Sequence, residues 1–376
     1  MREIRHSLRR VGVYMASITL GVAALVSIHS FRDDVARSIQ EEADVLMGAN
    51  ARLRASRELP DSISTILDSL SRAGVEMARV TTAGSMVLAP VSGAVRLMQV
   101  RAVDGSYPFY GTVSTEPAGH WTGGIGPGEV LVDPAALTQL DTEVGDTLMV
   151  GGVRLVIAAT VSDLPTDLGF DFAIGPKVYL SQEAMTRAEL LGAGSLARYE
   201  VFLRMPDRDD RGALRDRYSQ VFSATRVRYT TARQQAQDLS NGVRFLGRFL
   251  ALVGLGALLL GGIGVASSIH VYVNEKRPGV AVLRCMGASQ WTAFLAYMIQ
   301  AGAMGLLGSL AGVTLGVLVQ ETLPFVLKEV LPVAVDTHFS MGSALTGLGI
   351  GVWVAVIFAL IPLLSVKDVP PLQALR

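Results

Sequence analysis

Residues 249–273 read FLALVGLGALLLGGIGVASSIHVYV and contain no Asp, Glu, Lys or Arg. A helix needs about 20 consecutive apolar residues to cross the hydrocarbon core of a bilayer, and this stretch exceeds that length. Three further stretches without such charges are also long enough: Val11–Phe31, Cys285–Gln320 and Phe339–Val366. The sequence therefore predicts an α-helical membrane protein with four transmembrane helices, which excludes a wholly soluble enzyme.

The first apolar stretch follows four arginines, a pattern that also introduces a secretory signal peptide. Signal peptides have shorter apolar regions of about 7–15 residues and end at a cleavage site between small residues. Residues 11–31 form a longer stretch that ends in Ile28-His29-Ser30-Phe31, which offers no clear cleavage site. We therefore interpret this stretch as a membrane anchor that is retained.

Charges beside the apolar stretches predict which ends face the cytoplasm, because Lys and Arg accumulate in short cytoplasmic loops. The first ten residues hold four Arg against one Glu, and residues 274–284 hold three positive residues against one Glu. Residues 321–338 hold only Lys328 against three acidic residues. Both chain ends and the loop after residue 273 are therefore expected inside the cell, with residues 32–248 outside the cytoplasm.

This topology divides the chain into three parts. Residues 1–31 form the cytoplasmic N-terminus and the first transmembrane helix, and residues 32–248 form a large extracytoplasmic domain. Residues 249–376 form the other three helices, with a cytoplasmic loop at 274–289. The 33 Lys+Arg balance 33 Asp+Glu, and a net charge of zero argues against a nucleic-acid partner, because nucleic-acid binding depends on positive contacts to phosphates.

The extracytoplasmic domain has a mixed α and β pattern. Runs rich in β-branched residues predict strands at 96–103, 128–132, 147–160 and 198–204. Helical patterns occur at 61–73, 181–191 and 208–222, with Ser181 and Asp207 as N-caps, so the domain is expected to be α+β. Residues 116–128 are rich in Gly and predict a loop. Trp121 in this loop either contacts a ligand or, as we favour, covers the edge of the domain.

Heptad-like apolar series mark both ends of this domain and predict a helical stalk, since apolar residues in alternating steps of three and four form a seam between two helices. The alternative is that each helix packs separately on the domain. The proposed stalk residues are Val35, Ile39 and Leu46 in the first helix, and Leu239, Val243 and Leu246 in the second.

Small residues recur inside the predicted spans. Removing side chains along one stripe lets helices approach closely, which replaces the hydrophobic driving force that lipid does not provide. This spacing predicts helix packing, either within one bundle or between two copies of the chain. The packing residues are Gly308, Gly312 and Gly316 in the third stretch, and Gly347 and Gly351 in the fourth.

Several catalytic signatures are absent from the sequence. None of the four lysines follows a glycine, whereas the ATP-binding P-loop requires Gly-Lys-Ser/Thr. The five histidines are scattered without a His-Glu-x-x-His pair, so no metal site is expected. No Ser has Gly at both the second position before it and the second after it, as a nucleophile elbow requires. We therefore expect a chain that is not an enzyme and binds no cofactor of its own.

The predicted cytoplasmic loop reads NEKRPGVAVLRCMGAS over residues 274–289. Pro278 suits a first helical turn and Gly287 suits a C-terminal stop, which together predict a separate helix of about two turns. Val280, Leu283 and Gly287 share one face of this helix, with Arg284 beside them. Such a helix either rests among lipid headgroups or docks in a groove of a partner protein.

Together with the topology, two short segments resemble the FtsX-like permeases, the membrane subunits of MacB-type ABC systems. These segments are VAVLRCMGAS at 280–289 and PLQALR at 371–376. The start of the chain, with RHSLRR at 5–10 and LMGAN at 46–50, further resembles the N-terminal half of the long YbbP-type permeases. The chain is thus either a four-span relative or the first half of a longer permease.

The resemblance implies a partner that performs ATP hydrolysis. In this family a separate cytosolic ABC ATPase, which holds ATP-Mg, binds the loop between the second and third spans. The residues at the matching positions are Glu275, Lys276, Arg277, Val280, Leu283, Arg284 and Gly287. The family often has an acidic residue near position 279, where this chain has glycine.

The resemblance also implies a cellular location and a function. The chain would be a multi-pass protein of the cell inner membrane that passes motion from the ATPase to its periplasmic domain, a mechanism called mechanotransmission. Its further partners would be a second permease copy or a homologous half, membrane lipid and a periplasmic protein. The expected function is export or extraction of a lipid, lipoprotein or hydrophobic compound. The alternative is a non-transporting regulator that controls a periplasmic partner such as a cell-wall hydrolase.

Overall fold

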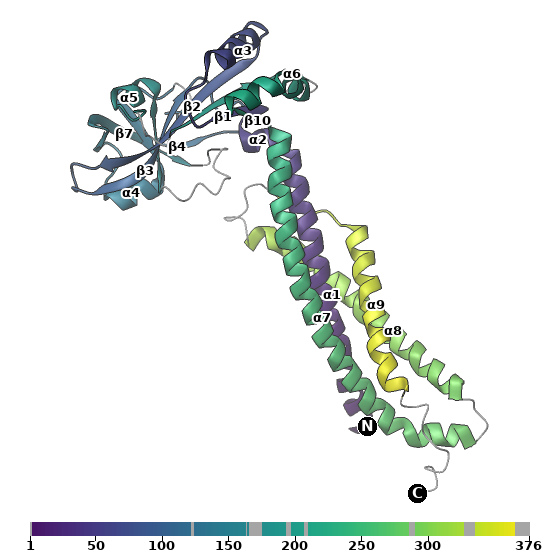
Figure 1. Ribbon diagram of the computed structural model, residues 1–376. Coiled ribbons are helices and arrows are strands. Elements are labelled where there is room, and N and C mark those ends of the chain that lie inside the picture. Colours follow the sequence, from purple (N-terminus) through teal and green to yellow (C-terminus); the bar gives the residue numbers. More distant parts are fainter. Residues whose placement is uncertain are drawn as a thin grey trace. The chain divides into compact units, whose positions relative to one another are not determined.

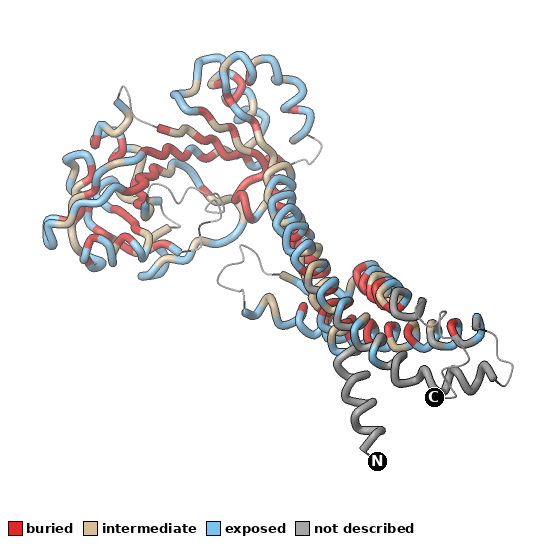
Figure 2. The backbone as a smooth tube through the Cα atoms, turned by 60° about the horizontal axis from the view of Figure 1, so that its bottom comes forward, coloured by how far each residue is buried: buried red, intermediate tan, exposed pale blue. Residues whose placement is uncertain are grey.

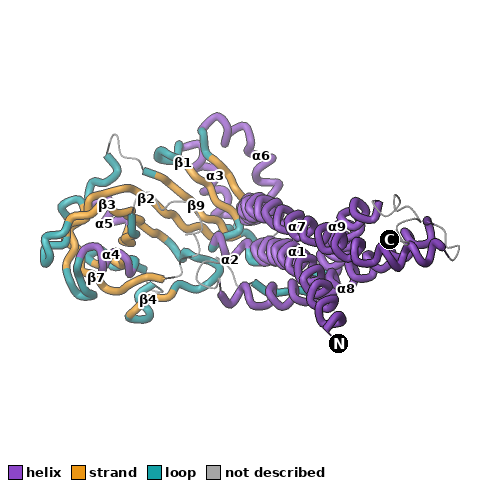
Figure 3. The backbone as a smooth tube through the Cα atoms, turned by 90° about the horizontal axis from the view of Figure 1, so that it is seen from below, coloured by secondary structure: helices purple, strands orange, loops and turns teal. Residues whose placement is uncertain are grey.

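The computed structural model describes residues 2–121, 124–162, 164, 175–192, 197–206, 210–285, 290–326 and 335–364. It divides into two compact units. We call Ile39–Asp238 the sheet unit, and Met1–Ser38 together with Leu239–Arg376 the helical unit. Figure 3 shows that the strands gather in the sheet unit and the long helices in the helical unit.

Ten strands form the sheet of the sheet unit, in the order β10-β1-β9-β2-β3-β8-β5-β7-β4, with β6 paired to β2 and β7 (Figure 1). Two neighbouring pairs, β3 with β8 and β5 with β7, are parallel, and the other pairs are antiparallel. The strands are β1 (Ala51–Ala55), β2 (Glu76–Leu88), β3 (Val95–Asp104), β4 (Ser114–Glu116), β5 (Glu129–Val132), β6 (Thr147–Val150), β7 (Val153–Ser162), β8 (Lys177–Ser181), β9 (Arg198–Arg204) and β10 (Arg228–Thr231).

Part of this sheet closes on itself. The pairing of β6 with both β2 and β7 completes a ring in the order β2-β3-β8-β5-β7-β6. Closure leaves no free edge among these six strands, which protects their backbone hydrogen-bonding groups from other chains. The ring encloses a core of fully buried side chains that includes Met98, Val100, Leu148 and Val178. Two short helices, α4 (Pro134–Leu140) and α5 (Gln182–Arg187), add Leu140 and Met185 to this core.

A second core lies where β1, β9 and β10 pack with α3 (Asp61–Arg72) and α6 (Asp210–Thr225). Alternate residues of the strands face it, as the pleat requires, and Leu53 and Leu203 are fully buried. From the helices, Ile63 and Leu67 share one face at a four-residue spacing. The sheet unit therefore has the α+β fold that the sequence predicts, with two apolar cores in place of one.

Three charged side chains lie together between β1 and β9. Glu200 is buried and its Oε1 atom lies 3.2 Å from Arg52 Nη1 and 2.8 Å from Arg54 Nε. Burial lowers the pKa of the Arg52 guanidinium, while the neighbouring Glu200 carboxylate acts in the opposite direction. The guanidinium also lies 6.0 Å from the ring centre of Phe202. Opposite charges on paired strands thus neutralise each other inside the domain.

The strands predicted at 96–103, 128–132 and 198–204 are confirmed as β3, β5 and β9. The strand predicted at 147–160 is a hairpin of β6 and β7, whose turn uses Gly151 and Gly152 with positive φ. All three helices predicted in this domain are also present, as α3, α5 and α6. Ser181 caps α5 by accepting a hydrogen bond from the Ala184 amide at 3.2 Å, whereas Asp207 lies outside the described residues.

Trp121 covers the sheet, as the sequence analysis favours. Its indole Nε1 donates a hydrogen bond to the Tyr107 carbonyl oxygen at 2.8 Å. Its ring packs edge-on against Tyr179 of β8, with 5.7 Å between the ring centres. The indole therefore fixes the loop that follows β3 onto the sheet.

The helical unit contains four helices that are long and apolar enough to cross a membrane. These spans are Met15–Glu41, Ala232–Ile263, Phe294–Val326 and Met341–Leu360. They belong to α1 (Arg2–Glu41), α7 (Ala232–Cys285), α8 (Gln290–Val326) and α9 (Met341–Leu364). The first two of these helices extend beyond the helical unit, because α1 ends and α7 begins within the sheet unit, where the short α2 (Ala43–Met47) follows α1.

The expectation of a separate helix in the loop 274–289 is wrong. The backbone of α7 is helical without interruption from Ala232 to Cys285, and it therefore passes through Pro278. A proline lacks one backbone N–H and removes one hydrogen bond, but the turns on either side of it can continue the helix. The second span and residues 274–285 consequently form one element.

Candidate functional site

The first transmembrane helix contacts each of the other three. Its buried residues Ile18, Val22 and Val26 form the apolar centre of the helical unit with Leu258 of α7, Val313 of α8 and Val354 of α9. These α1 residues recur every four positions along one stripe. A movement of α8, α9 or the membrane part of α7 therefore changes a contact with α1.

Helix α8 lies against α1 along three glycines spaced four residues apart. A Cβ atom at Gly312 would lie 2.8 Å from the Thr19 carbonyl oxygen, and one at Gly316 would lie 3.0 Å from that of Ala23. At Gly308 the space is wider, and the Thr19 hydroxyl donates a hydrogen bond to the Gly308 carbonyl oxygen at 3.0 Å. Only glycine permits so close an approach to the α1 backbone at Gly312.

Helix α9 uses its glycines on the same side of α1. A Cβ atom at Gly347 would overlap the Val26 side chain, and one at Gly351 would overlap both Val22 and the Ser309 hydroxyl of α8. Ser309 is fully buried and donates a hydrogen bond to the Gly305 carbonyl oxygen at 2.7 Å. The glycine stripes of α8 and α9, which the sequence analysis assigns to packing, thus meet within one chain.

Helix α7 runs antiparallel to α1. Gly261 lies beside Ser17, where a Cβ atom would lie 3.1 Å from the Ser17 carbonyl oxygen. Farther along, the Ser240 hydroxyl donates a hydrogen bond to the Ala36 carbonyl oxygen at 3.2 Å, and the Arg32 side chain fills the space above Gly247. The two helices therefore lie side by side, as the stalk hypothesis expects.

The side of α7 that faces α1 differs from the predicted one. Ser240 and Gly247 make the contact, while Leu246 is 59% exposed and Leu239 and Val243 are only partly buried. In α1, by contrast, Val35 and Ile39 are buried, as is Leu46 of α2. Ser240 and Gly247 occupy the contact because small side chains allow the two helix axes to approach closely.

Residues 274–289 were assigned to ATPase coupling from the family resemblance. The backbone of Glu275, Lys276, Arg277, Val280, Leu283 and Arg284 is helical as part of α7. Gly287 lies outside the described residues. The six described residues therefore lie in the last turns of a helix whose first residues belong to the sheet unit.

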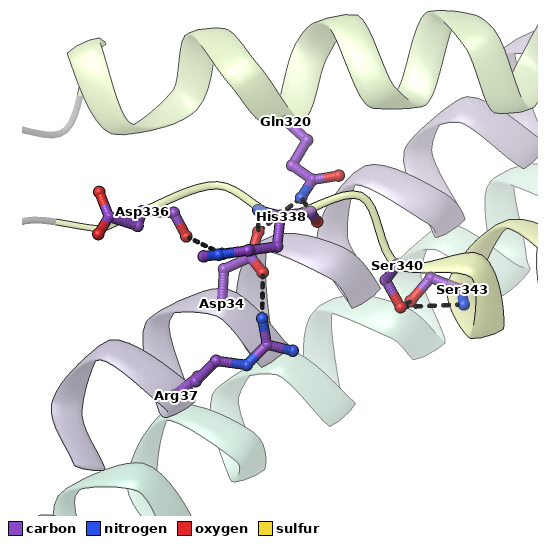
Figure 4. Close-up of polar contacts among 7 residues, drawn as sticks. All are labelled: Asp34, Arg37, Gln320, Asp336, His338, Ser340 and Ser343. Carbon is purple, nitrogen blue, oxygen red and sulfur yellow. Dashed lines mark hydrogen bonds and ion pairs between the residues drawn. The ribbon is translucent and has the colours of Figure 1, made fainter. Parts of the chain in front are cut away.

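A polar cluster that the sequence analysis missed joins α1 to the segment between α8 and α9 (Figure 4). The Asp34 carboxylate of α1 accepts hydrogen bonds from Gln320 Nε2 of α8 at 2.5 Å and from the His338 backbone N–H at 3.4 Å. Gln320 Nε2 also donates to the His338 carbonyl oxygen at 3.2 Å. Asp34 is 1% exposed and Gln320 is 2% exposed.

The sequence does hold a signal for this cluster. Asp34 follows the first apolar stretch by three residues, Gln320 ends the third stretch, and His338 precedes the fourth. If the four stretches cross the membrane in alternating directions, these three positions lie on the same side. Among the described residues no group of three or more His, Cys, Asp or Glu side chains could hold a metal ion, so the cluster is one of hydrogen bonds.

Two family models together match most of the chain. The model described as the MacB-like periplasmic core domain matches residues 12–221, which is more than half of the 376 residues. The model described as the FtsX-like permease C-terminal domain matches residues 251–371. The chain belongs to the FtsX-like, MacB-type family of ABC transporter permeases. This match confirms the resemblance found in the sequence, and with the four apolar helices it identifies a multi-pass membrane protein.

Two curated proteins and one solved structure illustrate the relationship of this permease to its family. The uncharacterized ABC transporter permease YbbP of Escherichia coli (strain K12) is 26% identical over 363 residues, which are 96% of this chain and 43% of that protein. The macrolide export ATP-binding/permease protein MacB of Bdellovibrio bacteriovorus is 25% identical over 140 residues, 37% of this chain and 21% of that protein. The permease spans less than half the length of these relatives.

The crystal structure of the periplasmic region of MacB from Actinobacillus actinomycetemcomitans is also similar. It is 9% identical, covers 52% of this chain and 95% of its own, and superposes with a TM-score of 0.35.

The FtsX-like family match includes α8, α9 and the membrane part of α7. The glycine contacts and two of the three residues of the polar cluster, Gln320 and His338, therefore lie within the permease region of the family.

Proposed function

We propose that this permease is the membrane subunit of an ABC transporter whose separate cytosolic ATPase drives a conformational change of the sheet unit. The observation that carries this proposal is the continuity of α7. One helix of 54 residues begins in the sheet unit and ends in the segment proposed for ATPase coupling. At about 1.5 Å per residue its length is about 80 Å. In this proposal α7 carries a displacement from one of its ends to the other.

Residues 1–376 contain no Gly-Lys-Ser/Thr sequence, so the proposal places ATP-Mg on an ATPase outside these residues. The name of the relative MacB combines ATP-binding and permease functions, which supports an ATPase as the partner of this permease. A second permease copy or a homologous half would complete the membrane part, since the YbbP relative is more than twice as long as the matched region.

The proposed orientation places residues 274–289 and both chain ends in the cytoplasm, and the sheet unit in the periplasm. Cys285 tests this directly because it is the only cysteine of the chain. A membrane-impermeant maleimide should label Cys285 in inside-out vesicles and leave it unlabelled in intact spheroplasts. In a chain that also carries Cys285→Ser, Ser71→Cys at an exposed position of the sheet unit should show the opposite pattern. The reverse result at both positions would contradict the orientation.

Coupling to the ATPase is tested by Leu283→Asp. At a buried apolar contact an unpaired carboxylate costs several kcal/mol, so the ATPase should no longer purify with the tagged permease from its native membrane. Val282→Asp is the matched control, because it introduces the same charge about 100° away on the same helix. If Leu283→Asp retained the ATPase and its rate of ATP hydrolysis, the coupling assignment would be wrong.

The substrate that we propose is a lipid, lipoprotein or other hydrophobic compound handled by the sheet unit. The competing proposal is a regulator that transports nothing and controls a periplasmic protein. Reconstitution of the purified complex distinguishes the two. A transporter moves labelled lipid or hydrophobic compound out of proteoliposomes in an ATP-dependent manner, whereas a regulator hydrolyses ATP without such movement and changes the activity of its protein partner.

A further inference from the structure

The Asp34 cluster ties three segments that are distant in the sequence. One oxygen of the carboxylate, Oδ2, accepts from the Gln320 amide of α8 and from the His338 backbone, while the same Gln320 amide donates to the His338 carbonyl oxygen. Each pair of segments therefore shares a direct hydrogen bond. Both side chains are almost completely buried, so water does not compete effectively for these bonds.

The donors that cross from one segment to another in this cluster are neutral. The Asp34 carboxylate has a cation nearby, Arg37 Nη1 at 3.9 Å from Oδ1, but this arginine belongs to the same helix and is about half exposed. Its ion pair therefore does not hold α8 or the connecting segment. A charged acceptor with neutral donors makes short, strong hydrogen bonds. Loss of these donors would leave a buried carboxylate without them, which costs free energy, so a release requires new contacts elsewhere.

The connecting segment leads directly into α9. His338 precedes by two residues Ser340, which caps α9 by accepting a hydrogen bond from the Ser343 amide at 3.3 Å. The Ser340 carbonyl oxygen also accepts from the Ala344 amide at 3.1 Å. A displacement of His338 relative to α1 is consequently passed to the first turn of α9 (Figure 4).

We propose that Asp34 and Gln320 are positioning residues of the permease, which hold the segment between α8 and α9 on α1 in one conformational state and release it in another. This inference rests on the proposed function, because a release matters only in a subunit that changes conformation. The glycine contacts bring α8 and α9 close to α1, and the Asp34 cluster adds hydrogen bonds that fix the position of His338 relative to α1.

The test measures hydrogen exchange by mass spectrometry on the full chain in lipid nanodiscs. Asp34→Leu leaves the Gln320 amide and the His338 N–H without their acceptor. Exchange of the amides of residues 335–340 should rise by about tenfold or more, since a hydrogen bond to a charged group contributes about that factor to a local equilibrium. Asp34→Asn keeps an acceptor oxygen at the same place and should restore most of the protection.

Asp33→Leu is the matched control. Asp33 is the neighbouring acid, partly exposed and paired with Arg32 of its own helix at 2.8 Å, so its loss should leave residues 335–340 unchanged. Gln320→Glu provides a second route, because it keeps the size of the side chain while opposing two carboxylates, and it should also raise exchange in this segment.

Two results would overturn the proposal. The first is unchanged exchange of residues 335–340 in both Asp34→Leu and Gln320→Glu. The second is a uniform rise throughout α1, α8 and α9 that Asp34→Asn does not reverse, which would make the cluster a part of fold stability alone. Because the ATPase takes no part in these measurements, their failure is distinct from a failure of the Leu283→Asp experiment.

Discussion

The two units of the permease both have a buried apolar centre, but they differ in what makes the close contacts and in which large apolar side chains stay exposed. In the sheet unit, buried positions follow the strands (Figure 2). The fully buried residues include the large apolar Leu53, Ile63 and Leu148. In the helical unit, glycine and serine occupy the helix contacts, while Phe245 and Leu260 are each 72% exposed. Water drives large apolar groups inward, whereas lipid does not, so close packing and polar contacts specify the helical unit.

The two units also stabilise a buried carboxylate with different kinds of partner. Glu200 of the sheet unit lies against two guanidinium groups on a neighbouring strand, and its charge is balanced in place. Asp34 of the helical unit meets neutral donors from other segments. We interpret the first arrangement as part of a fixed domain. The second arrangement joins three segments of the helical unit through hydrogen bonds.

The largest effect is expected from truncating a large side chain in the sheet unit. Leu53→Ala should lower the free energy of unfolding of this unit by about 3.5 kcal/mol, through lost burial and the cavity that remains. Hydrogen exchange of the β1 and β9 amides in the full chain measures this change. Leu307→Ala, at an exposed position of α8, should change the protection of its helix by less than about 0.5 kcal/mol. Equal losses at both positions would contradict the difference between the two units.

Breaking the charge balance of the sheet unit should have a slightly smaller effect. Glu200→Gln leaves Arg52 without a counter-ion and should cost about 3 kcal/mol, at the low end for a broken buried pair because Arg54 is partly exposed. The same amide-exchange measurement reports this loss. Glu76→Gln is the matched control, since Glu76 forms an exposed pair with Arg204 at 3.3 Å and should contribute less than about 1 kcal/mol.

Sequence periodicity predicted the sheet unit well where the strands are locally distinct. β3 is a short apolar-rich run, VRLMQVRAVD, and the Gly151-Gly152 turn marks the β6–β7 hairpin. β2 was missed because its sequence EMARVTTAGSMVL contains a central Gly-Ser and no simple alternation. The closure of six strands into a ring was also missed, since it depends on two residue pairs between β2 and β6 that are distant in the sequence.

The helical unit shows a different limit of sequence analysis. Glycine spacing identified the packing residues, but the partner of the stripes, α1, became known only from the structure. In α7 both a leucine stripe and a small-residue stripe follow similar steps, and hydrophobicity favoured Leu246 although Ser240 and Gly247 make the contact. Apolar spacing alone does not distinguish these two stripes, because the close approach of the helices depends on the size of the side chains at the contact.

The third prediction adds a side chain where the helical unit has no room. Gly351→Leu places atoms onto Val22 and Ser309 and should weaken the association of α9 with α1 and α8 by about 2 kcal/mol or more. The thermal unfolding midpoint of the full chain in nanodiscs measures this loss. Gly349→Leu is the matched control in the same helix, because a Cβ atom there meets nothing within 4 Å. A lower midpoint in both variants would indicate that helix propensity or insertion, and not packing, determines the result.

The smallest effect distinguishes the two stripes of α7. Ser240→Ala removes the hydrogen bond to the Ala36 carbonyl oxygen and should cost about 1 kcal/mol, since Ser240 is fully buried. Leu246→Ala removes more atoms, but the leucine is largely exposed and its loss should change less than Ser240→Ala does. Hydrogen exchange of the α7 amides around residue 240 measures both variants. A larger loss of protection in Leu246→Ala than in Ser240→Ala would indicate that Leu239, Val243 and Leu246 join α7 to α1. The small residues would then not hold the two helices together.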